Sequence, residues 1–296
     1  MNKYDAFYRP KLGEAWLLTM GIFLVAGTVL SALVVSIFGL SSLAGGASAD
    51  ETAEAATSGS STLLMYVVSF LPVLCYVFFR SKGLYKKAQL FGFQGYPNPK
   101  PQLGKIPWPA LILILPLGIV SMSFLVDPLT SWMEMPEFLK KVFAKMSQSD
   151  LPTFLSVVVC APLLEEWLLR RVALKGLLQH TKPWVAIVMT ALMFAIMHMN
   201  PWQAIPAFLL GCVFGWVYYR TRSYWICVCM HAINNGASFL IASLFPDMPA
   251  DASLTYFFPG SSYYLVLAAS LVVFVFLAWL MNKYLAPAPN LNVNHE

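Results

Sequence analysis

Charged side chains are scarce in this sequence. Lys, Arg, Asp and Glu together make up 11% of the 296 residues, whereas a soluble globular domain carries about 25%. Hydrophobic residues make up 58% of the chain. A chain with so little charge and so much apolar surface cannot cover itself with polar groups, which excludes a water-soluble globule.

The sequence also lacks common signatures of metal binding and of covalent catalysis. Its five cysteines all fall in apolar segments without CxxC or other metal-type spacing, and we interpret them as buried free thiols: Cys75, Cys160, Cys212, Cys227 and Cys229. No HExxH motif occurs, and no serine or cysteine is evidently paired with a histidine. A covalent mechanism is therefore less favoured.

Long apolar runs recur from one end of the sequence to the other. A run of about 20 apolar residues crosses a hydrocarbon core of about 30 Å as a helix. The runs predict an all-α fold, a polytopic membrane protein with about eight transmembrane helices: residues 15–40, 62–79, 107–126, 151–169, 184–199, 204–219, 224–245 and 262–282. We expect one membrane domain, 1–296, with N-terminal spans and loops (1–149), a core (150–245), and a last span and tail (246–296).

The basic residues follow the spans in an ordered way. When successive connections are assigned alternately to two sides, all but three of the 19 lysines and arginines fall on one side; the exceptions are Lys140, Lys141 and Lys145. The positive-inside rule then places both termini in the cytoplasm. We interpret the net charge of +5 as this topology signal, and expect the lipid bilayer, but no nucleic acid, as a partner.

Three segments carry local signals that we do not connect with chemistry. Residues 41–61 are small, acidic and low in complexity, which predicts a flexible external loop. Residues 136–146 have an apolar and a basic face, which predicts a short helix on the outer surface. Ala207, Gly211 and Gly215 form a stripe of small residues that predicts close helix packing.

A few polar residues lie inside or beside the apolar spans. They are Glu165, Glu166 and Arg170 in the fourth span, His198 in the fifth, and His231, Asn234 and Asn235 in the seventh. A charged side chain at a helix centre costs about 2.5–3.5 kcal/mol even on a lenient scale, and such residues usually mark function. The alternative is a buried polar network that only fixes helix packing.

The spacing of these residues predicts partners. Glu166 and Arg170 are four residues apart with the acid first, so they share a helix face and can pair. Glu165 lies about 100° further round the helix and has no obligatory cation, which makes it the better general base of the two. His231 and Asn235, also four apart, project together as hydrogen-bond donors.

Ideal helix geometry brings only some of these groups together. A simple antiparallel hairpin places Glu165 and His198 at nearly the same depth, but leaves His231 about 15 Å nearer the cytoplasm. We expect Pro201 and Pro206 to break residues 199–206 into an irregular segment that relieves this mismatch.

The three polar motifs together resemble a known family. The sequence reads EEWLLR at residues 165–170, FAIMH at 194–198 and HAINN at 231–235. This is similar to the EExxxR, FxxxH and HxxxN motifs, in the same order, of the CAAX protease and bacteriocin-processing (CPBP or Abi) family of intramembrane glutamic endopeptidases. That family is related to the endopeptidase that trims prenylated CAAX proteins. The resemblance covers residues 150–245.

The resemblance implies an intramembrane endopeptidase that acts on membrane-associated peptides or proteins. In the implied site Glu165 activates water with the help of His198. His231 and Asn235 stabilise the oxyanion. Three further motif residues would support this catalytic set: Glu166, Arg170 and Phe194. We expect a multi-pass protein of the bacterial plasma membrane.

Other interpretations stay open at this point. We favour catalysis without a cofactor, but Glu165, His198 and His231 with a water would also make a familiar zinc set. A transporter or an ion or proton relay is a second candidate, although it predicts symmetric halves and the ionisable residues are confined to the second half. A catalytically inactive membrane scaffold is the third.

Overall fold

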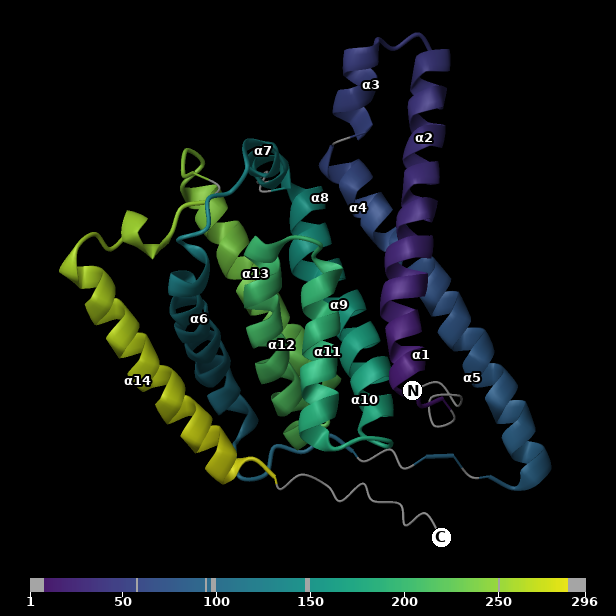
Figure 1. Cartoon of the computed structure of the whole chain (residues 1–296), viewed down its shortest axis with the longest axis vertical. Helices are drawn as coiled ribbons and strands as arrows, with labels where there is room; N and C mark the ends of the chain where they lie inside the picture. Colours follow the sequence, from purple (N-terminus) through teal and green to yellow (C-terminus); the bar gives the residue numbers. More distant parts are fainter. Residues whose placement is uncertain are drawn as a thin grey trace.

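The structure is a computed structural model that describes residues 8–56, 58–93, 95–96, 100–146, 150–249 and 251–286. Within these residues every regular element is a helix and no strand occurs (Figure 1). Seven helices of the described chain are long and apolar enough to cross a membrane: Leu12–Ala44, Gly59–Phe91, Trp108–Thr130, Leu151–Leu177, Pro201–Thr221, Tyr224–Leu244 and Ser261–Tyr284. The expected polytopic all-α membrane fold is confirmed.

One of the eight predicted transmembrane helices is shorter than predicted. The fifth predicted span, 184–199, is helix α11 (Pro183–Met197), which has only 15 residues and is about 22 Å long. It ends early because His198, Met199 and Asn200 form a tight turn, in which Met199 has a positive φ of 54°. Helix α11 therefore falls short of the length that a full span needs.

Several long rods are assembled from consecutive elements. The first comprises α1 (Leu12–Trp16), η1 (Leu17–Gly27) and α2 (Thr28–Ala44). The second and third comprise α4 (Gly59–Ser69) with α5 (Leu71–Phe91), and η2 (Trp108–Ala110) with α6 (Leu111–Thr130). The fourth comprises α8 (Leu151–Phe154), η3 (Leu155–Cys160), α9 (Ala161–Glu166), η4 (Trp167–Leu174) and α10 (Lys175–Leu177). Helices α12 (Pro201–Thr221), α13 (Tyr224–Leu244) and α14 (Ser261–Tyr284) follow.

Helices α11 and α12 form an antiparallel hairpin at the centre of the bundle (Figure 1). A Cβ added to Gly211 would lie 3.0 Å from the Ala191 Cα, and one added to Gly215 would lie 3.1 Å from the Ile187 Cγ2. The predicted close packing along the small-residue stripe is confirmed. Rods α1–α2 and α4–α5 flank one side of this hairpin, and α6 and α14 lie on the other.

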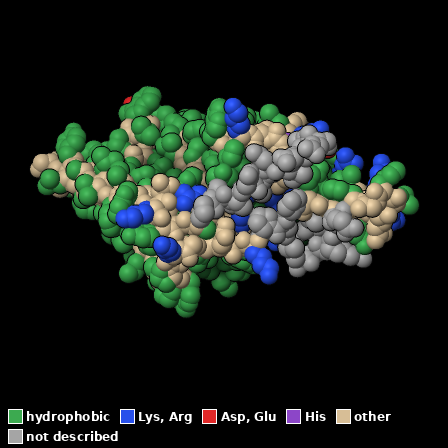
Figure 2. Space-filling view, turned by 90° about the horizontal axis from the view of Figure 1, so that it is seen from below, with side chains coloured by type: hydrophobic (Ala, Val, Ile, Leu, Met, Phe, Trp, Pro, Cys, Tyr) green, Lys and Arg blue, Asp and Glu red, His purple; other side chains and the backbone are tan. Residues whose placement is uncertain are grey.

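The described chain starts and finishes at the same end of the bundle. Helix α1 begins there and α14 ends there (Figure 1). Figure 2 looks at this end and shows many Lys and Arg side chains with almost no Asp or Glu between them. This charge distribution agrees with the positive-inside rule, and the cytoplasmic location of this end stays a prediction.

The segment 41–61, predicted to be a flexible loop, is largely helical. Helix α2 continues to Ala44, and a further helix, α3 (Ala49–Ala56), precedes α4. The Ser48 Oγ accepts a hydrogen bond from the Glu51 backbone N–H at 3.2 Å, and the Glu51 carboxylate accepts one from the Ser48 N–H at 2.8 Å. These reciprocal bonds form a capping box. Hydrogen bonds from Ser48 also lower the pKa of Glu51. The loop prediction was wrong because it relied on the low complexity of the segment and did not consider the capping box of Ser48 and Glu51.

Two other local predictions have different outcomes. The short helix expected at 136–146 is present as α7 (Glu137–Met146), at the end of the bundle opposite to the termini (Figure 1). The irregular segment expected at 199–206 is absent from the described chain, because α12 already begins at Pro201. Proline fits the first helical turn, where its missing N–H costs nothing. The Asn200 Oδ1 caps this helix by accepting the Gln203 N–H at 2.9 Å.

Candidate active site

The fourth rod and α12 enclose a buried ion pair. Glu166 and Arg170 are both fully buried, and the Arg170 Nε lies 3.0 Å from the Glu166 Oε2, although without the alignment of a hydrogen bond. The Arg170 Nη1 donates to the Glu166 Oε1 at 3.1 Å, and its Nη2 donates to the Gly211 carbonyl at 3.2 Å. The guanidinium also lies 5.2 Å from the centre of the Phe194 ring and 5.4 Å from that of Phe214. The pairing that the spacing predicts is therefore present, with cation–π contacts on the charge.

Glu166 has a second partner on α13. The His231 Nδ1 lies 3.0 Å from the Glu166 Oε1, and His231 is 4% exposed. A Glu166 carboxylate that is neutralised by Arg170 can only accept, so this His231 nitrogen carries the proton. Glu166 thereby fixes the orientation of an imidazole whose other nitrogen points toward Glu165.

Glu165 has a different environment from its neighbour. The Tyr66 hydroxyl of α4 donates to the Glu165 Oε1 at 2.6 Å. The Glu165 Oε2 lies 3.7 Å from the His231 Nε2, beyond hydrogen-bond distance, and the Glu165 side chain is 12% exposed. No Lys or Arg pairs with Glu165 among the described residues. One oxygen of this carboxylate is thus held by a neutral donor, while the other has no hydrogen bond.

Tyr66 is the site residue that the sequence analysis missed. It lies 99 residues before Glu165, in a rod without any motif. Its ring packs 5.5 Å from that of Phe70, which in turn lies 4.4 Å from that of Phe23. The sequence signal was a lone phenol in an otherwise apolar run, which does not distinguish it from an ordinary core aromatic residue.

Phe194 connects the two histidines. The His198 Nδ1 donates to the Phe194 carbonyl at 2.9 Å, because a carbonyl oxygen can only accept. This bond leaves the lone pair of Nε2 available in the neutral ring. The Phe194 ring centre lies 5.0 Å from that of His198 and 5.5 Å from that of His231. No hydrogen bond or ion pair joins His198 to Glu165 in the described part of the chain.

Asn235 lies one turn beyond His231 but is held by other groups. Its Nδ2 donates to the Val157 carbonyl of η3 at 2.9 Å, and its Oδ1 accepts from the Asn234 Nδ2 at 3.1 Å. One N–H of the Asn235 amide is therefore already used to tie α13 to the fourth rod. The second N–H of this amide is the one that could meet a substrate.

The part of the chain that holds the three motifs is similar to a known protein family. Residues 147–237 match a family model described as Rce1-like, type II CAAX prenyl endopeptidase Rce1-like. The match covers 91 of the 296 residues, about a third of the chain, and shows that this segment is similar to that family. The segment contains the three motifs, whereas Tyr66 lies outside it. No curated protein and no solved structure matches the chain.

The donor atoms of the three motifs do not converge as ligands of one metal. In the described chain, no group of three or more His, Cys, Asp or Glu side chains is arranged to hold a metal ion. The Nδ1 atoms of His198 and His231 are used in contacts with Phe194 and Glu166, so only their Nε2 atoms remain as possible ligands. The zinc set of Glu165, His198 and His231 would need these side chains to rearrange.

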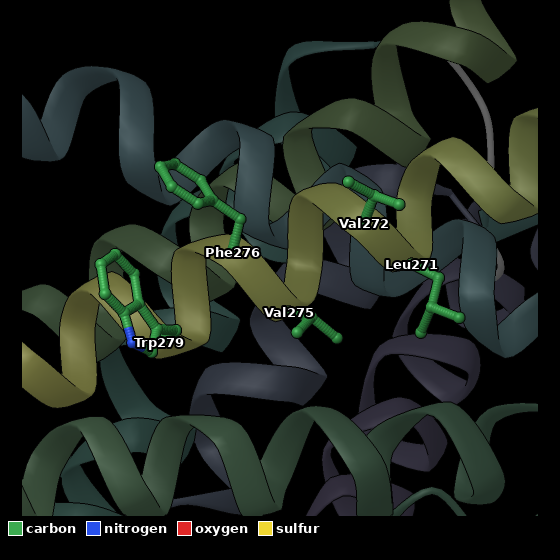
Figure 3. A pocket seen from close by; sticks show the side chains of 5 residues that line it. All are labelled: Leu271, Val272, Val275, Phe276 and Trp279. Atoms are coloured by element: carbon green, nitrogen blue, oxygen red, sulfur yellow. The ribbon is translucent and has the colours of Figure 1, made fainter.

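Two hollows of the described surface are lined by none of the motif residues. One, of about 430 Å³, is lined by five side chains that all come from α14, as Figure 3 shows. Another, of about 440 Å³, lies between α6, α12, α13 and α14 and is mostly apolar. The first belongs to a single exposed apolar helix face, which is typical of contact with lipid chains.

Proposed function

We propose that the chain is an intramembrane endopeptidase that hydrolyses peptide bonds of membrane-associated peptides or proteins. The observation that carries this proposal is the separation of two adjacent carboxylates. Glu166 is neutralised by the buried Arg170 guanidinium, while Glu165 has a tyrosine donor and a free oxygen. Environments that differ in this way give neighbouring carboxylates separate roles.

In the proposed reaction the free oxygen of Glu165 takes a proton from water. The resulting hydroxide adds to the carbonyl carbon of the substrate, and the carbonyl π electrons move to its oxygen. When this oxyanion collapses, the C–N bond breaks and the leaving nitrogen takes the proton back from Glu165. A general base of this kind contributes about 10² to 10⁴-fold. His198, with its Nε2 lone pair available, helps to hold the attacking water.

The oxyanion would be stabilised from α13. His231 donates its Nδ1 proton to Glu166, so it offers an N–H from Nε2 when the ring carries a second proton. The positive charge of this imidazolium would be stabilised by two carboxylates. Glu166 lies 3.0 Å from its Nδ1 and Glu165 lies 3.7 Å from its Nε2. The remaining N–H of Asn235 is the second donor. One such donor is worth about 10² to 10³-fold in rate.

The reaction is proposed to proceed without a metal or other cofactor. Support comes from the arrangement of the donors, because no three His, Cys, Asp or Glu side chains of the described chain are grouped as ligands of one metal ion. Activity of the purified protein should survive exhaustive chelation. Loss of cleavage that stoichiometric zinc restores would overturn this part of the proposal.

Glu165→Gln tests the proposed activity most directly. The amide keeps the shape of the side chain and can still accept from Tyr66, but it cannot take a proton from water. We expect cleavage to fall by at least about 10²-fold. Membranes from cells that produce the wild type, this variant or no protein should be compared for peptides whose cleavage depends on the protein.

Glu134→Gln is the matched control, because it makes the same chemical change at an exposed position between α6 and α7. This variant should cleave like the wild type. A Glu165→Gln protein that cleaves at a near wild-type rate would end the catalytic assignment. The absence of any dependent peptide would favour the scaffold interpretation instead.

A further inference from the structure

A second buried cation lies well away from the candidate active site. Arg222 follows α12, about 16 Å of helix rise beyond Gly211. It is 8% exposed, and its backbone has the left-handed conformation with a φ of 55°. The Arg222 Nε and Nη2 atoms are buried and have no hydrogen-bond partner within the described chain. Among the rings of the described residues, that of Tyr219 lies against the guanidinium, with its centre 5.3 Å away.

The neighbouring Arg220 shows what a satisfied arginine looks like at the same helix end. Its guanidinium donates to the Ala286 carbonyl at 3.0 Å, to the Asn282 Oδ1 at 2.7 Å and to the Leu285 carbonyl at 3.1 Å. Arg222 makes no comparable bond. Burial lowers the pKa of Arg222, but a guanidinium stays protonated in proteins.

Two other arginines lie near the same tyrosine as Arg222. The guanidinium groups of Arg222, Arg9 and Arg171 all act electrostatically on the buried Tyr218 hydroxyl. These arginines come from three separate parts of the chain, namely the end of α12, the segment before α1, and η4. Arg9 and Arg171 also have partners of their own.

The segment that carries Arg9 is packed firmly in place. A Cβ on Gly176 would lie 2.5 Å from the Pro10 Cδ, so this glycine is needed for the chain to pass α10. The Arg9 Nη1 donates to the Tyr8 carbonyl at 2.8 Å, and the His180 Nε2 lies 3.3 Å from the Arg9 carbonyl. Arg9 is 6% exposed. Arg9 is therefore held by packed structure and not by a loose surface.

An unsatisfied buried guanidinium is costly, and each such group in a folded protein calls for an explanation such as a bound ion. Its planar fork matches the geometry of phosphate, to which it can donate two parallel hydrogen bonds. Arg222 lies between two spans at the end of the bundle where phosphates of lipid headgroups are found, and basic pockets between spans bind such groups.

We infer that Arg222 forms a binding site for one phosphate group at the membrane boundary, to which Arg9 and Arg171 add positive charge. A phosphate ester suits the site, and either the headgroup of an anionic phospholipid or a soluble phosphate can supply it. The site is separate from the proposed peptidase site. Its test uses no cleavage reaction, so that the two proposals fail independently.

The experiment measures thermal unfolding of the full chain in detergent after its lipids have been removed. Phosphatidylglycerol, phosphatidylcholine and inorganic phosphate are each added at matched ionic strength. We expect a saturable rise in the unfolding temperature with phosphatidylglycerol but not with phosphatidylcholine. A rise with inorganic phosphate as well would assign the site to phosphate in general, and no rise with either anion would overturn the inference.

Arg222→Met is the test variant and Arg220→Met the matched control. Arg222→Met keeps the left-handed backbone conformation but removes the unsatisfied charge. It should weaken binding of the anion about tenfold or more, because the guanidinium donors are lost. Its stability without an anion should be unchanged or higher, because no buried charge is left. Arg220→Met should lose stability yet keep the response to the anion. An equal loss of response in both variants would overturn the site.

Arg222→Lys provides a second readout if the methionine variant does not fold. Lysine keeps the charge but lacks the planar fork. It should bind phosphatidylglycerol more weakly than the wild type in native mass spectrometry of the intact protein. Wild-type affinity in Arg222→Lys, together with no effect of Arg222→Met where that variant folds, would show that Arg222 does not contact the phosphate.

Discussion

At the scale of single residues, the site depends on which donor reaches which carboxylate oxygen. Tyr66 and His231 both approach Glu165, but only Tyr66 is within hydrogen-bond distance. The phenol fixes one oxygen of Glu165 and so directs the other toward the space where water would sit. In the proposed reaction Tyr66 acts through Glu165, as a positioning residue.

Tyr66→Phe keeps the ring that packs on Phe70 and removes only the hydroxyl. A hydrogen bond to a charged group contributes about 1.5–3 kcal/mol, so we expect kcat to fall about tenfold or more. KM should stay within about twofold, because Tyr66 orients the base and does not bind substrate. Steady-state kinetics of cleavage would measure both constants.

Tyr224→Phe is the matched control for this change. Its hydroxyl donates to the Leu163 carbonyl at 2.7 Å, two residues before Glu165 on the same rod. Loss of that bond should lower stability but leave kcat nearly unchanged. If both phenylalanine variants lost kcat equally, Tyr66 would be only a structural contact.

Glu166 should matter to stability in a way that Glu165 does not. Glu166→Gln leaves the fully buried Arg170 without its counter-charge, which costs about 3–5 kcal/mol of unfolding free energy. The double variant Glu166→Gln with Arg170→Met removes both charges and should recover part of this loss. Unfolding of the wild type, both single variants and the double variant measures the coupling. Additive effects would show that the two side chains do not act as a pair.

At the scale of elements, the α11–α12 hairpin positions the site. The close approach at Gly211 brings the Phe194 ring, the Gly211 carbonyl and the Arg170 guanidinium together. The Phe194 ring of α11 contacts both His198, at the end of the same helix, and His231 of α13, so its position relates the two imidazoles.

Gly211→Ala should therefore damage both stability and cleavage. The added Cβ would lie 3.0 Å from the Ala191 Cα and 3.3 Å from the Phe194 Cδ1, so the two helices must separate. Overpacking of this kind costs about 1–3 kcal/mol of unfolding free energy. The unfolding temperature and the cleavage rate should both fall.

Gly83→Ala makes the same change in α5, where nothing lies within 4 Å of the added Cβ. That variant should gain about 0.5–1 kcal/mol, since alanine is the better helix former. A Gly211→Ala protein as stable and active as Gly83→Ala would show that the close approach of α11 and α12 is not needed.

At the scale of the whole molecule, the number of crossings fixes where the termini lie. Helix α11 is short, but it enters from the end where the termini lie and α12 returns to that end. The count of crossings is even whether this hairpin spans the membrane fully or only dips into it. Both termini should then face the same side, which the basic residues predict to be the cytoplasm.

Reporter fusions would measure this topology. A reporter at either terminus should be cytoplasmic, and one inserted after residue 50, beside α3, should be outside. A cytoplasmic reporter at residue 50 would contradict the predicted orientation. An insertion after residue 93 serves as the control, because it follows a basic rod end and should remain inside.

The sequence by itself determined what local spacing controls. Apolar runs identified the membrane fold, and the four-residue interval predicted that Glu166 and Arg170 lie face to face, as they do. Within one helix such contacts follow from the turn of the backbone alone. The same kind of signal was present but overlooked at Ser48 and Glu51, which cap α3.

Only the tertiary structure decided the contacts between helices. Tyr66 meets Glu165 across 99 residues, and His231 meets Glu166 across 65. Straight rods placed His231 at the wrong depth, because they contained neither the short α11 with its tight turn nor the π-helical turns of η3 and η4 beside Glu165. A short helix or a π-helical turn changes the position of every later residue along the helix axis and the side of the helix on which it lies. The sequence therefore named most of the candidate residues, while helix packing selected the oxygen or nitrogen that each one meets.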